Sequence, residues 1–332
     1  MPDSLWNLEN VSLAGDSLVG NSRNRLHEIS LHIPAGVTAI VGYSGAGKTS
    51  LLNVLAGMET PSSGKVESRH SDTRLSAAEF SLPLFWAPQD GGLWPHLTAI
   101  QHLNAMPGCQ TELNAANSRK SADNWLQLFD LEHRQNAVPR ELSKGEQARL
   151  SIARALAANS AVLLMDEPLT HVDPARKPKY WSLIREHIMA SNSSLVFCTH
   201  ETAVVIRESQ FVICLENGQV IHTGTSQQLY DNPPNVNVAQ FLGPINWFDR
   251  EASSIWLADQ ISQQTDFGLR PERTLLIPDE NGALRILSFH FSGSYAETKL
   301  EHIPSSSEKT FVHRPSGNVH QPGQLVRIQV LS

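Results

Sequence analysis

GYSGAGKT, residues 42–49, decides the fold of this 332-residue chain. It fits the pattern G-x-x-x-x-G-K-[ST], whose glycines let the backbone curl so that successive N–H groups converge on phosphate oxygens. The flanking segments agree with such a loop, because 37–42 (VTAIVG) has a strand pattern and 48–57 has helical spacing. We expect Lys48 to reach the β- and γ-phosphates and the Thr49 hydroxyl to ligate Mg²⁺. The residues predicted to contact the nucleotide in this segment are Gly42, Ser44, Gly45, Gly47, Lys48, Thr49 and Ser50.

A second segment, AVLLMDEP (161–168), complements the phosphate loop. Its apolar strand ends in Asp166, which places a carboxylate at the C-terminal edge of a sheet, where it can hold Mg²⁺ through water. Glu167 follows directly and can polarise the attacking water as a general base. On its own, Asp-Glu after a strand is more often a capped helix start. Together with the phosphate loop, the catalytic interpretation is favoured.

Strand-like and helix-like segments alternate up to about residue 232. Short apolar runs at 29–33, 161–166 and 195–199 predict strands, and 123–131 and 146–158 have the spacing of helices. This alternation predicts an α/β domain, residues 1–232, with a mostly parallel sheet.

The pattern changes after DNPPN (231–235), and residues 233–332 are predicted to form a second, β-rich domain. Short strands separated by turn signals suggest a small β-barrel there, and SSSEK (305–309) is predicted to be a loop. The predicted strand segments are 253–261 (SSIWLADQI), 273–278 (RTLLIP), 284–293 (LRILSFHFSG) and 324–332 (QLVRIQVLS).

Composition and charge exclude several classes. Lys and Arg total 26 against 33 Asp and Glu, a net charge of −7, which argues against nucleic-acid binding through bulk positive charge. The three cysteines are far apart, so neither a disulfide framework nor a zinc ribbon is indicated. No apolar stretch approaches the roughly 18 residues that cross a bilayer, and no export signal is visible at the start. We therefore expect a cytoplasmic protein.

The segment ELSKGEQARLSIARAL (141–156) narrows the choice among nucleotide-binding proteins. Ser143 and Gly145 precede a long amphipathic helix, where a hydroxyl and backbone N–H groups can face an anion. Read alone, it is an N-capped helix. Just upstream of the strand that ends in Asp166, it resembles the signature motif of ATP-binding cassette (ABC) ATPases, usually written LSGGQ. Lys144 and Glu146 stand where that motif has a glycine and a glutamine.

Other marks of this family follow in order, so that the resemblance covers nearly all of residues 5–230. Gln89, in FWAPQDGGLWPHLTAIQHL (85–103), resembles the glutamine loop, which senses the metal and the attacking water and couples to a transporter. LTHVDP (169–174) resembles the loop whose aspartate, here Asp173, communicates between subunits. CTHE (198–201) places His200 like the switch histidine that contacts the γ-phosphate.

The resemblance implies a P-loop NTPase cassette with a mostly parallel sheet and a helical subdomain, followed by a small all-β barrel-like domain. It implies hydrolysis of ATP with Mg²⁺ in a head-to-tail homodimer. Glu167, His200 and Gln89 are then catalytic, and Thr49, Gln89 and Asp166 face the metal. Ser143, Gly145 and Glu146 complete the site of the other subunit, and Asp173 lies at the subunit interface.

The tail is similar to the accessory (TOBE-like) β-barrel of bacterial importer ATPases, in FLGPINWF (241–248), FGLRPER (267–273) and QLVRIQV (324–330). This resemblance implies an ATPase peripheral on the inner face of the membrane, working with permease subunits and an external binding protein. The cargo classes of such importers are oxyanions, metal ions, sugars and polyamines. Whether the tail only stabilises the dimer or also binds a regulator is left open.

Three alternatives remain beside the importer. An exporter ATPase is disfavoured only by the tail. A soluble ABC ATPase acting on DNA or ribosomes predicts a coiled-coil insertion or two cassettes in one chain, and neither is present. A small-molecule kinase is disfavoured by the signature motif, Gln89 and His200.

The sequence departs from the family where adenine is held. Members carry an aromatic residue near the end of the first strand, whereas NVSLAGDSLVG (10–20) has none, and Trp6 lies earlier in that strand. Stacking of a base on an aromatic ring contributes about 1–3 kcal/mol in nucleic-acid complexes. The sequence therefore predicts weaker ATP affinity or looser base selectivity.

Overall fold

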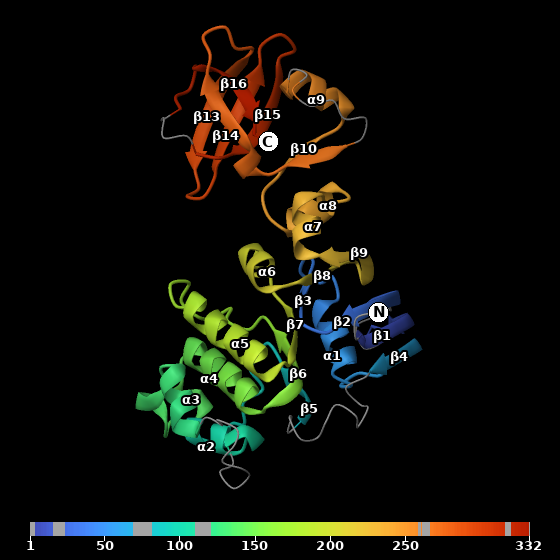
Figure 1. Cartoon of the computed structure of the whole chain (residues 1–332), viewed down its shortest axis with the longest axis vertical. Helices are drawn as coiled ribbons and strands as arrows, with labels where there is room; N and C mark the ends of the chain where they lie inside the picture. The colour runs from blue at the N-terminus through green and yellow to red at the C-terminus, as the bar shows by residue number, and fades with distance from the viewer. Residues whose placement is uncertain are drawn as a thin grey trace. The chain divides into compact units, whose positions relative to one another are not determined.

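The computed structural model describes residues 4–15, 24–68, 82–109, 121–257, 260, 266–315 and 320–331. The chain divides into two compact units, Met1–Ser226 and Gln227–Ser332 (Figure 1). The domain boundary that we place after residue 232 stays a prediction. No helix among these residues is long and apolar enough to cross a membrane.

The first unit is built on a six-stranded sheet in the order β5-β6-β7-β3-β8-β9. Its strands pair in parallel except at β8 and β9, which are antiparallel. Every residue of β6 is buried, as expected of a parallel strand that is covered on both faces. These strands are β3 (Val37–Val41), β5 (Leu82–Ala87), β6 (Ser160–Asp166), β7 (Ser194–Cys198), β8 (Phe211–Glu216) and β9 (Gln219–Thr225).

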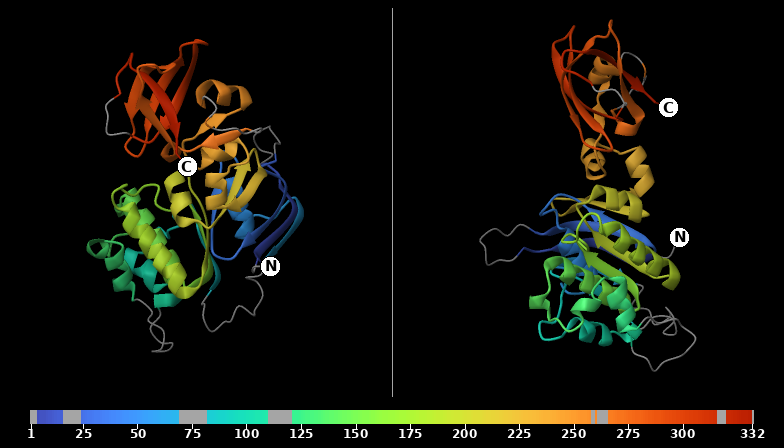
Figure 2. Two further views of the ribbon diagram at one scale, coloured as in Figure 1. Left: turned by 45° about the horizontal axis from the view of Figure 1, so that its top comes forward. Right: turned by 90° about the vertical axis from the view of Figure 1, so that its left-hand side faces the viewer.

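Helix α1 (Lys48–Leu55) follows the phosphate loop and packs between two sheets. The second sheet is antiparallel, in the order β2-β1-β4. Leu51, Leu52 and Leu55 of α1 share one buried core with residues of both sheets, and this arrangement is visible in Figures 1 and 2. The second sheet consists of β1 (Ser4–Leu13), β2 (Leu26–Pro34) and β4 (Ser63–Ser68).

Helices complete the first unit. Helices α2, α3 and α4 contact one another, and α4 also contacts β5 and β6, so that this helical region is tied to the sheet. The predicted mostly parallel sheet with a helical subdomain is thus confirmed. The helices are α2 (Ala99–Asn104), α3 (Ala122–Leu128), α4 (Lys144–Ala157), α5 (Lys177–Ser191) and α6 (Thr202–Glu208), with short 3-10 turns η3 (Pro107–Cys109), η4 (Glu132–Arg134) and η5 (Pro139–Glu141).

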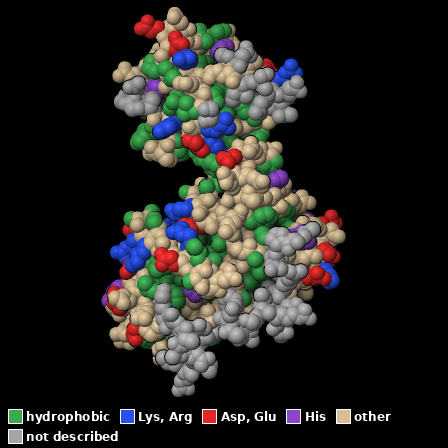
Figure 3. Space-filling view, in the orientation of Figure 1, with side chains coloured by type: hydrophobic (Ala, Val, Ile, Leu, Met, Phe, Trp, Pro, Cys, Tyr) green, Lys and Arg blue, Asp and Glu red, His purple; other side chains and the backbone are tan. Residues whose placement is uncertain are grey.

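On the face shown in Figure 3, Lys and Arg side chains lie beside Asp and Glu side chains. Several charged side chains of the first unit form ion pairs. Arg185 and Arg207 both bind Glu208, and Lys177 donates to Glu201 at 2.6 Å.

The second unit contains a five-stranded antiparallel sheet in the order β12-β16-β13-β14-β15 and a two-stranded sheet of β10 and β11. The Arg314 N–H donates to the Thr274 carbonyl at 2.9 Å, which brings the end of β15 to the start of β12 and curls the larger sheet toward a barrel. The strands are β10 (Asn246–Phe248), β11 (Phe267–Leu269), β12 (Thr274–Pro278), β13 (Leu284–Phe291), β14 (Ala296–His302), β15 (Ser307–His313) and β16 (Leu325–Val330).

Two local predictions for this unit were wrong. Residues 253–261 were expected to form a strand, but Arg250–Leu257 is helix α9, which buries Ser253, Trp256 and Leu257 on one face. Residues 305–309 were expected to be a loop, but β15 already begins at Ser307 and pairs with β14. In the first case the apolar face of α9 packs into the core of the second unit, and in the second case the backbone of residues 307–309 pairs with β14.

Arg270, from the FGLRPER segment, is a buried anchor of the second unit. Its guanidinium donates to the carbonyls of Tyr230, Ala239 and Gly243 at 3.0–3.2 Å and lies 4.2 Å from the centre of the Tyr230 ring. One side chain therefore holds helices α7 (Ser226–Asp231) and α8 (Val236–Phe241) next to β11 and the 3-10 turn η6 (Pro271–Arg273).

Two histidines are buried inside the barrel. His313 is fully buried, with its Nε2 2.9 Å from the Thr298 hydroxyl and its Nδ1 2.9 Å from the Arg314 carbonyl. Its ring lies 5.8 Å from that of His320, which is 3% exposed. Burial lowers the pKa of both imidazoles below the ordinary value of about 6.5.

This burial predicts that the second unit loses stability in mild acid. The unfolded chain takes up protons on these two histidines at a higher pH than the folded chain does. Stability therefore falls as pH drops below about 6.5, by at most about 1.4 kcal/mol per pH unit for each histidine. Calorimetric unfolding of the full chain between about pH 7 and pH 5 measures this slope. His313→Gln should flatten it, and an unchanged slope in that variant would contradict the assignment.

Candidate functional site

The phosphate loop requires glycine at its turns. Gly42, Gly45 and Gly47 have φ values of 154°, 81° and 102°, which side-chain-bearing residues rarely adopt. A Cβ at Gly42 would lie 2.2 Å from the Leu215 carbonyl oxygen, and one at Gly47 would lie 2.8 Å from that of Arg25. The backbone at Leu215 and Arg25 therefore leaves no room for a side chain at Gly42 or Gly47. The loop leads directly into the N-terminus of α1.

The side chains of this loop occupy different surroundings. The Lys48 ammonium folds back over the loop and donates to the carbonyls of Gly42 and Tyr43 at 2.8 and 3.0 Å. Ser44 is exposed, whereas Ser50 is buried on α1. A lysine ammonium beside a glycine-rich loop at a helix N-terminus suits the phosphate chain of a nucleotide.

Thr49 and Asp166 meet across the site. The Thr49 hydroxyl donates to Oδ2 of Asp166 at 2.7 Å, although the two residues are far apart in the sequence. The structure thus brings together two of the three predicted metal-facing residues. Hydroxyl and carboxylate oxygens are the ligands that Mg²⁺ accepts, so this pair fits that ion.

Asp166 has a second partner that sequence reasoning missed. The Cys198 thiol donates to Oδ1 of Asp166, with sulfur and oxygen 2.6 Å apart. Burial, reinforced by the Asp166 charge, raises the pKa of this thiol well above its ordinary value, so it stays protonated and acts as a donor. The register of two neighbouring buried strands was the signal that could have indicated this contact.

Glu167 is held just beyond the strand in a strained turn. Its φ is 50° and that of Leu169 is 140°, values that are unfavourable for side-chain-bearing residues and cluster at functional sites. Its carboxylate oxygen Oε2 lies 3.1 Å from the Thr170 hydroxyl and 2.9 Å from Nδ1 of His200. The structure therefore joins the predicted base to the predicted switch histidine and adds Thr170, which the sequence did not single out.

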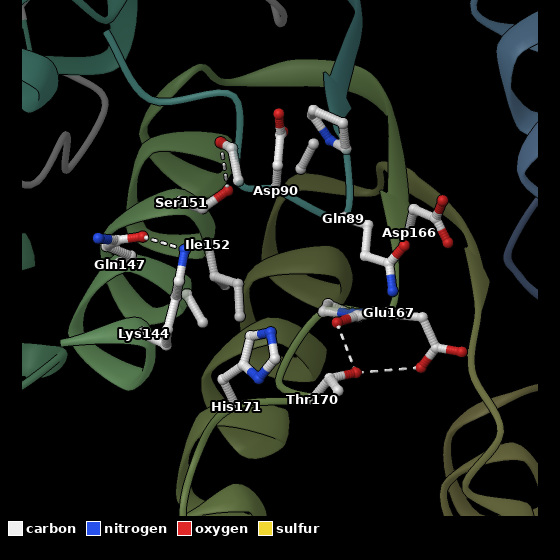
Figure 4. A pocket seen from close by; sticks show the side chains of 15 residues that line it. Gln89, Asp90, Lys144, Gln147, Ser151, Ile152, Asp166, Glu167, Thr170 and His171 are labelled. Carbon is white, nitrogen blue, oxygen red and sulfur yellow. Dashed lines mark hydrogen bonds between the residues drawn. The ribbon is translucent and has the colours of Figure 1, made fainter. Parts of the chain in front are cut away.

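A small pocket of about 60 Å³ lies where the glutamine loop, the start of α4 and the Asp166–Glu167 turn meet (Figure 4). In Figure 4 the Gln89 amide extends toward Asp166 and Glu167, while Lys144 enters from the opposite side. The predicted residues Gln89, Asp166 and Glu167 thus line one small pocket.

The start of α4 is organised by reciprocal capping. The Ser143 hydroxyl accepts from the Glu146 N–H at 3.2 Å, and the Glu146 carboxylate accepts from the Ser143 N–H at 2.7 Å. Arg134 donates to the same carboxylate at 3.1 Å. Although burial acts to raise the pKa of Glu146, the bonds from Ser143 and Arg134 outweigh it and keep that pKa below its usual value. The Glu146 side chain is therefore bound to its own helix terminus. Ser143 is exposed at that terminus.

Gly145, in the first turn of α4, lies next to the segment 169–174 that contains Asp173. A Cβ at Gly145 would lie 2.9 Å from the His171 carbonyl oxygen, so only glycine lets α4 approach that loop. Asp173 is exposed, and its carboxylate accepts from the Ala175 N–H at 2.9 Å. Both positions present backbone or carboxylate groups at the surface.

Helix α4 also holds the segment that follows Gln89. Arg154, which is 3% exposed, donates to the carbonyls of Gly91 and Gly92 at 2.9 and 2.7 Å and lies 5.0 Å from the centre of the Trp94 ring. Burial lowers the pKa of Arg154 to about 10. This link was not predicted, because it depends on the packing of two distant segments.

Trp6 is not available as a platform for adenine. It is only 1% exposed and belongs to the core between the two sheets of the first unit. Residues 16–20 of the segment where an aromatic is expected lie outside the described residues. The burial of Trp6 agrees with the sequence, in which Trp6 stands too early in the first strand to replace the missing aromatic residue.

Comparisons with known proteins agree with this geometry. A family model described as "ABC transporter" matches residues 26–170. The chain is similar to the glucose import ATP-binding protein GlcV of Saccharolobus solfataricus, with 30% identity covering 76% of this chain and 75% of that protein. It is also similar to a probable sulfate/thiosulfate import ATP-binding protein, CysA, of Chlorella vulgaris, with 34% identity covering 66% of this chain and 92% of that protein.

Two further similarities concern iron import and a solved structure. The Fe(3+) ions import ATP-binding protein FbpC of Rhizobium etli has 33% identity, covering 66% of this chain and 62% of that protein. A dimeric ATP-binding cassette in a post-hydrolysis state, bound to ADP and Pi, superposes with a TM-score of 0.55. That match has 26% identity and covers 67% of this chain and 98% of the other.

The capping of α4 gives a stability prediction. Glu146→Ala removes the acceptor for the Ser143 N–H and for Arg134, and it should lower the free energy of unfolding by about 1 kcal/mol. Glu146→Gln keeps an oxygen that accepts the Ser143 N–H and should lose less. Urea unfolding of the full chain measures both, with Glu132→Ala, on a nearby exposed turn, as the control for loss of a negative charge. Equal stability of Glu146→Ala and the unchanged chain would contradict this role.

Proposed function

This chain belongs to the ABC transporter family, and we propose on that premise that it is the ATP-hydrolysing subunit of an importer. The observation that supports hydrolysis most directly is the joining of four predicted residues in two contacts, Thr49 with Asp166 and Glu167 with His200. The chain is an ATPase of this family. What we propose beyond this activity is that the transport is import and that the chain works with the partners named below.

The residues divide the chemistry among them. The loop N–H groups and Lys48 bind the phosphates. Thr49, Asp166 and Gln89 would hold the Mg²⁺ ion. A bound Mg²⁺ neutralises the charge that develops on the phosphates. Glu167 accepts a proton from the attacking water, and His200 and Thr170 keep its carboxylate oriented.

The second half of each site comes from the partner in a head-to-tail homodimer. We assign direct phosphate contacts to Ser143 and Gly145, because the Ser143 side chain is exposed and both lie at the N-terminus of the 14-residue helix α4. Glu146 supports them by fixing the helix terminus, and Asp173 lies at the interface. ATP binding closes this dimer and hydrolysis reopens it, a population shift driven by the nucleotide.

Import is supported by the names of the relatives and by the second unit. The relatives named above are import ATP-binding proteins for glucose, sulfate or thiosulfate, and Fe³⁺. The second unit has the antiparallel barrel expected of a TOBE-like accessory domain. We infer permease subunits that dock near residues 90–103, an external binding protein, and a position on the inner face of the membrane. The cargo is a small solute such as a sugar, an oxyanion, a metal ion or a polyamine.

The composite site predicts that hydrolysis depends on association. The ATPase rate per mole of purified chain should rise with protein concentration until the dimer saturates. Glu167→Gln removes the general base and should lower the rate about 10²–10⁴-fold. Both are measured by phosphate release.

A control separates the base from the fold. Glu186→Gln makes the same chemical change on the exposed face of α5 and should keep the full rate. A rate that survives in Glu167→Gln would overturn the assigned base. A rate per mole independent of concentration, in a chain that sizing shows to be monomeric, would overturn the composite site.

The missing adenine platform predicts loose base selectivity. ATP and GTP should bind with dissociation constants within about tenfold of each other, because residues 10–20 offer no aromatic side chain for adenine to stack on. Titration with both nucleotides on Glu167→Gln tests this. Trp6→Phe should leave the ratio unchanged, since Trp6 is buried. Micromolar ATP affinity with a strong preference over GTP would contradict the prediction.

A further inference from the structure

The Asp166 carboxylate is held by a donor on each of its two oxygens. The Thr49 hydroxyl binds Oδ2 at 2.7 Å and the Cys198 thiol binds Oδ1 at 2.6 Å. The two donors come from different elements, since Thr49 belongs to α1 and Cys198 ends β7. Rotation of the carboxylate would break both bonds, so its orientation is fixed from two sides.

The position of Cys198 follows from the sheet register. Strands β6 and β7 are parallel neighbours, and Asp166 stands opposite Cys198 at their carboxyl ends. Cys198 is fully buried and Asp166 is 4% exposed. In such a place a carboxylate oxygen without a protein donor carries a large desolvation cost. The Cys198 thiol supplies the donor for Oδ1 of Asp166.

The same residue also fixes the neighbouring acid. The Cys198 carbonyl accepts from the Glu167 N–H at 3.0 Å. Two residues further along the chain, His200 binds the Glu167 carboxylate. The end of β7 therefore aligns both acidic residues of the site, the first through a side chain and the second through the backbone.

We propose that Cys198 is a positioning residue for the metal site: its thiol orients Asp166 so that Oδ2 accepts from Thr49, and the carboxylate oriented in this way would help to hold Mg²⁺. This inference rests on the proposed role of Asp166 in holding Mg²⁺. Groups that orient a metal-facing carboxylate through hydrogen bonds typically change metal affinity 10–100-fold when they are lost. Thiols are weaker donors than hydroxyls, so the lower end of that range applies.

The test measures Mg²⁺ affinity without turnover. In the Glu167→Gln background, binding of a fluorescent ATP analogue is titrated with Mg²⁺ on the full chain. Cys198→Ala should raise the Mg²⁺ concentration for half-maximal enhancement about tenfold. Cys198→Ser, which keeps an O–H donor, should restore most of that affinity. Nucleotide binding in the absence of Mg²⁺ should be the same in every variant.

Cys214 offers a matched control. It is a fully buried cysteine on β8 in the same sheet, paired in register with Val41, and burial raises the pKa of its thiol to about 12. Cys214→Ala removes the same atom from the same sheet and should leave the Mg²⁺ dependence unchanged. An equal loss in Cys214→Ala and Cys198→Ala would show a general packing effect and overturn the proposal.

The remaining outcomes separate this inference from the function on which it rests. If the unchanged site shows no Mg²⁺ dependence, the proposed metal role of Asp166 fails and this inference fails with it. If Mg²⁺ dependence is present and Cys198→Ala matches the Cys198 chain, only the inference fails.

An infrared measurement tests the bond without removing the thiol from the sheet. The S–H stretching band of Cys198, identified by difference against Cys198→Ser, should lie at lower frequency than that of Cys214, because a strong acceptor weakens the S–H bond. It should shift when Mg²⁺ and nucleotide are added. Bands of equal frequency would overturn the proposal.

Discussion

The hydrogen bond between the Thr49 hydroxyl and the Asp166 carboxylate is the contact on which the site depends. It joins α1, the helix that follows the phosphate loop, to the end of β6, where Asp166 stands next to Glu167. The bond forms because α1 is packed between two sheets and because β6 is buried along its whole length. Apolar side chains hold both α1 and β6 in place. The hydrophobic core therefore sets the distance between the Thr49 hydroxyl and the Asp166 carboxylate.

Polar groups next to this core are almost all engaged by neighbours. Asp166 takes donors on both oxygens, Glu167 lies between Thr170 and His200, and Arg154 caps the carbonyls of the segment after Gln89. Buried charges that lack such partners are strongly destabilising, so these contacts also hold the geometry needed for chemistry. Glu146 is engaged in the same way, because its carboxylate stabilises the helix terminus that presents Ser143 and Gly145.

Sequence patterns predicted the parts of the fold that local chemistry controls. The glycines of the phosphate loop and the continuous apolar runs of β6 and β7 each have few structural solutions. The prediction failed at 253–257, where a short amphipathic segment fits either a helix or a strand, and at 307–309, where a polar run gives no local sign that it will pair with β14. Trp6 lies too early in the first strand to replace the adenine platform, and its burial agrees with that interpretation.

The sequence by itself determined the residue types of the site, their order along the chain and the strand ends at which they stand. It indicated Lys48, Asp166 and Glu167 because phosphate binding and proton transfer need those groups at those positions. Only the tertiary structure decided which groups touch. The Cys198–Asp166 contact, the Arg154 link and the commitment of Glu146 to its own helix depend on registers and packing between segments that are distant in the chain. Local sequence does not encode such distances, because they are fixed only when the whole core closes.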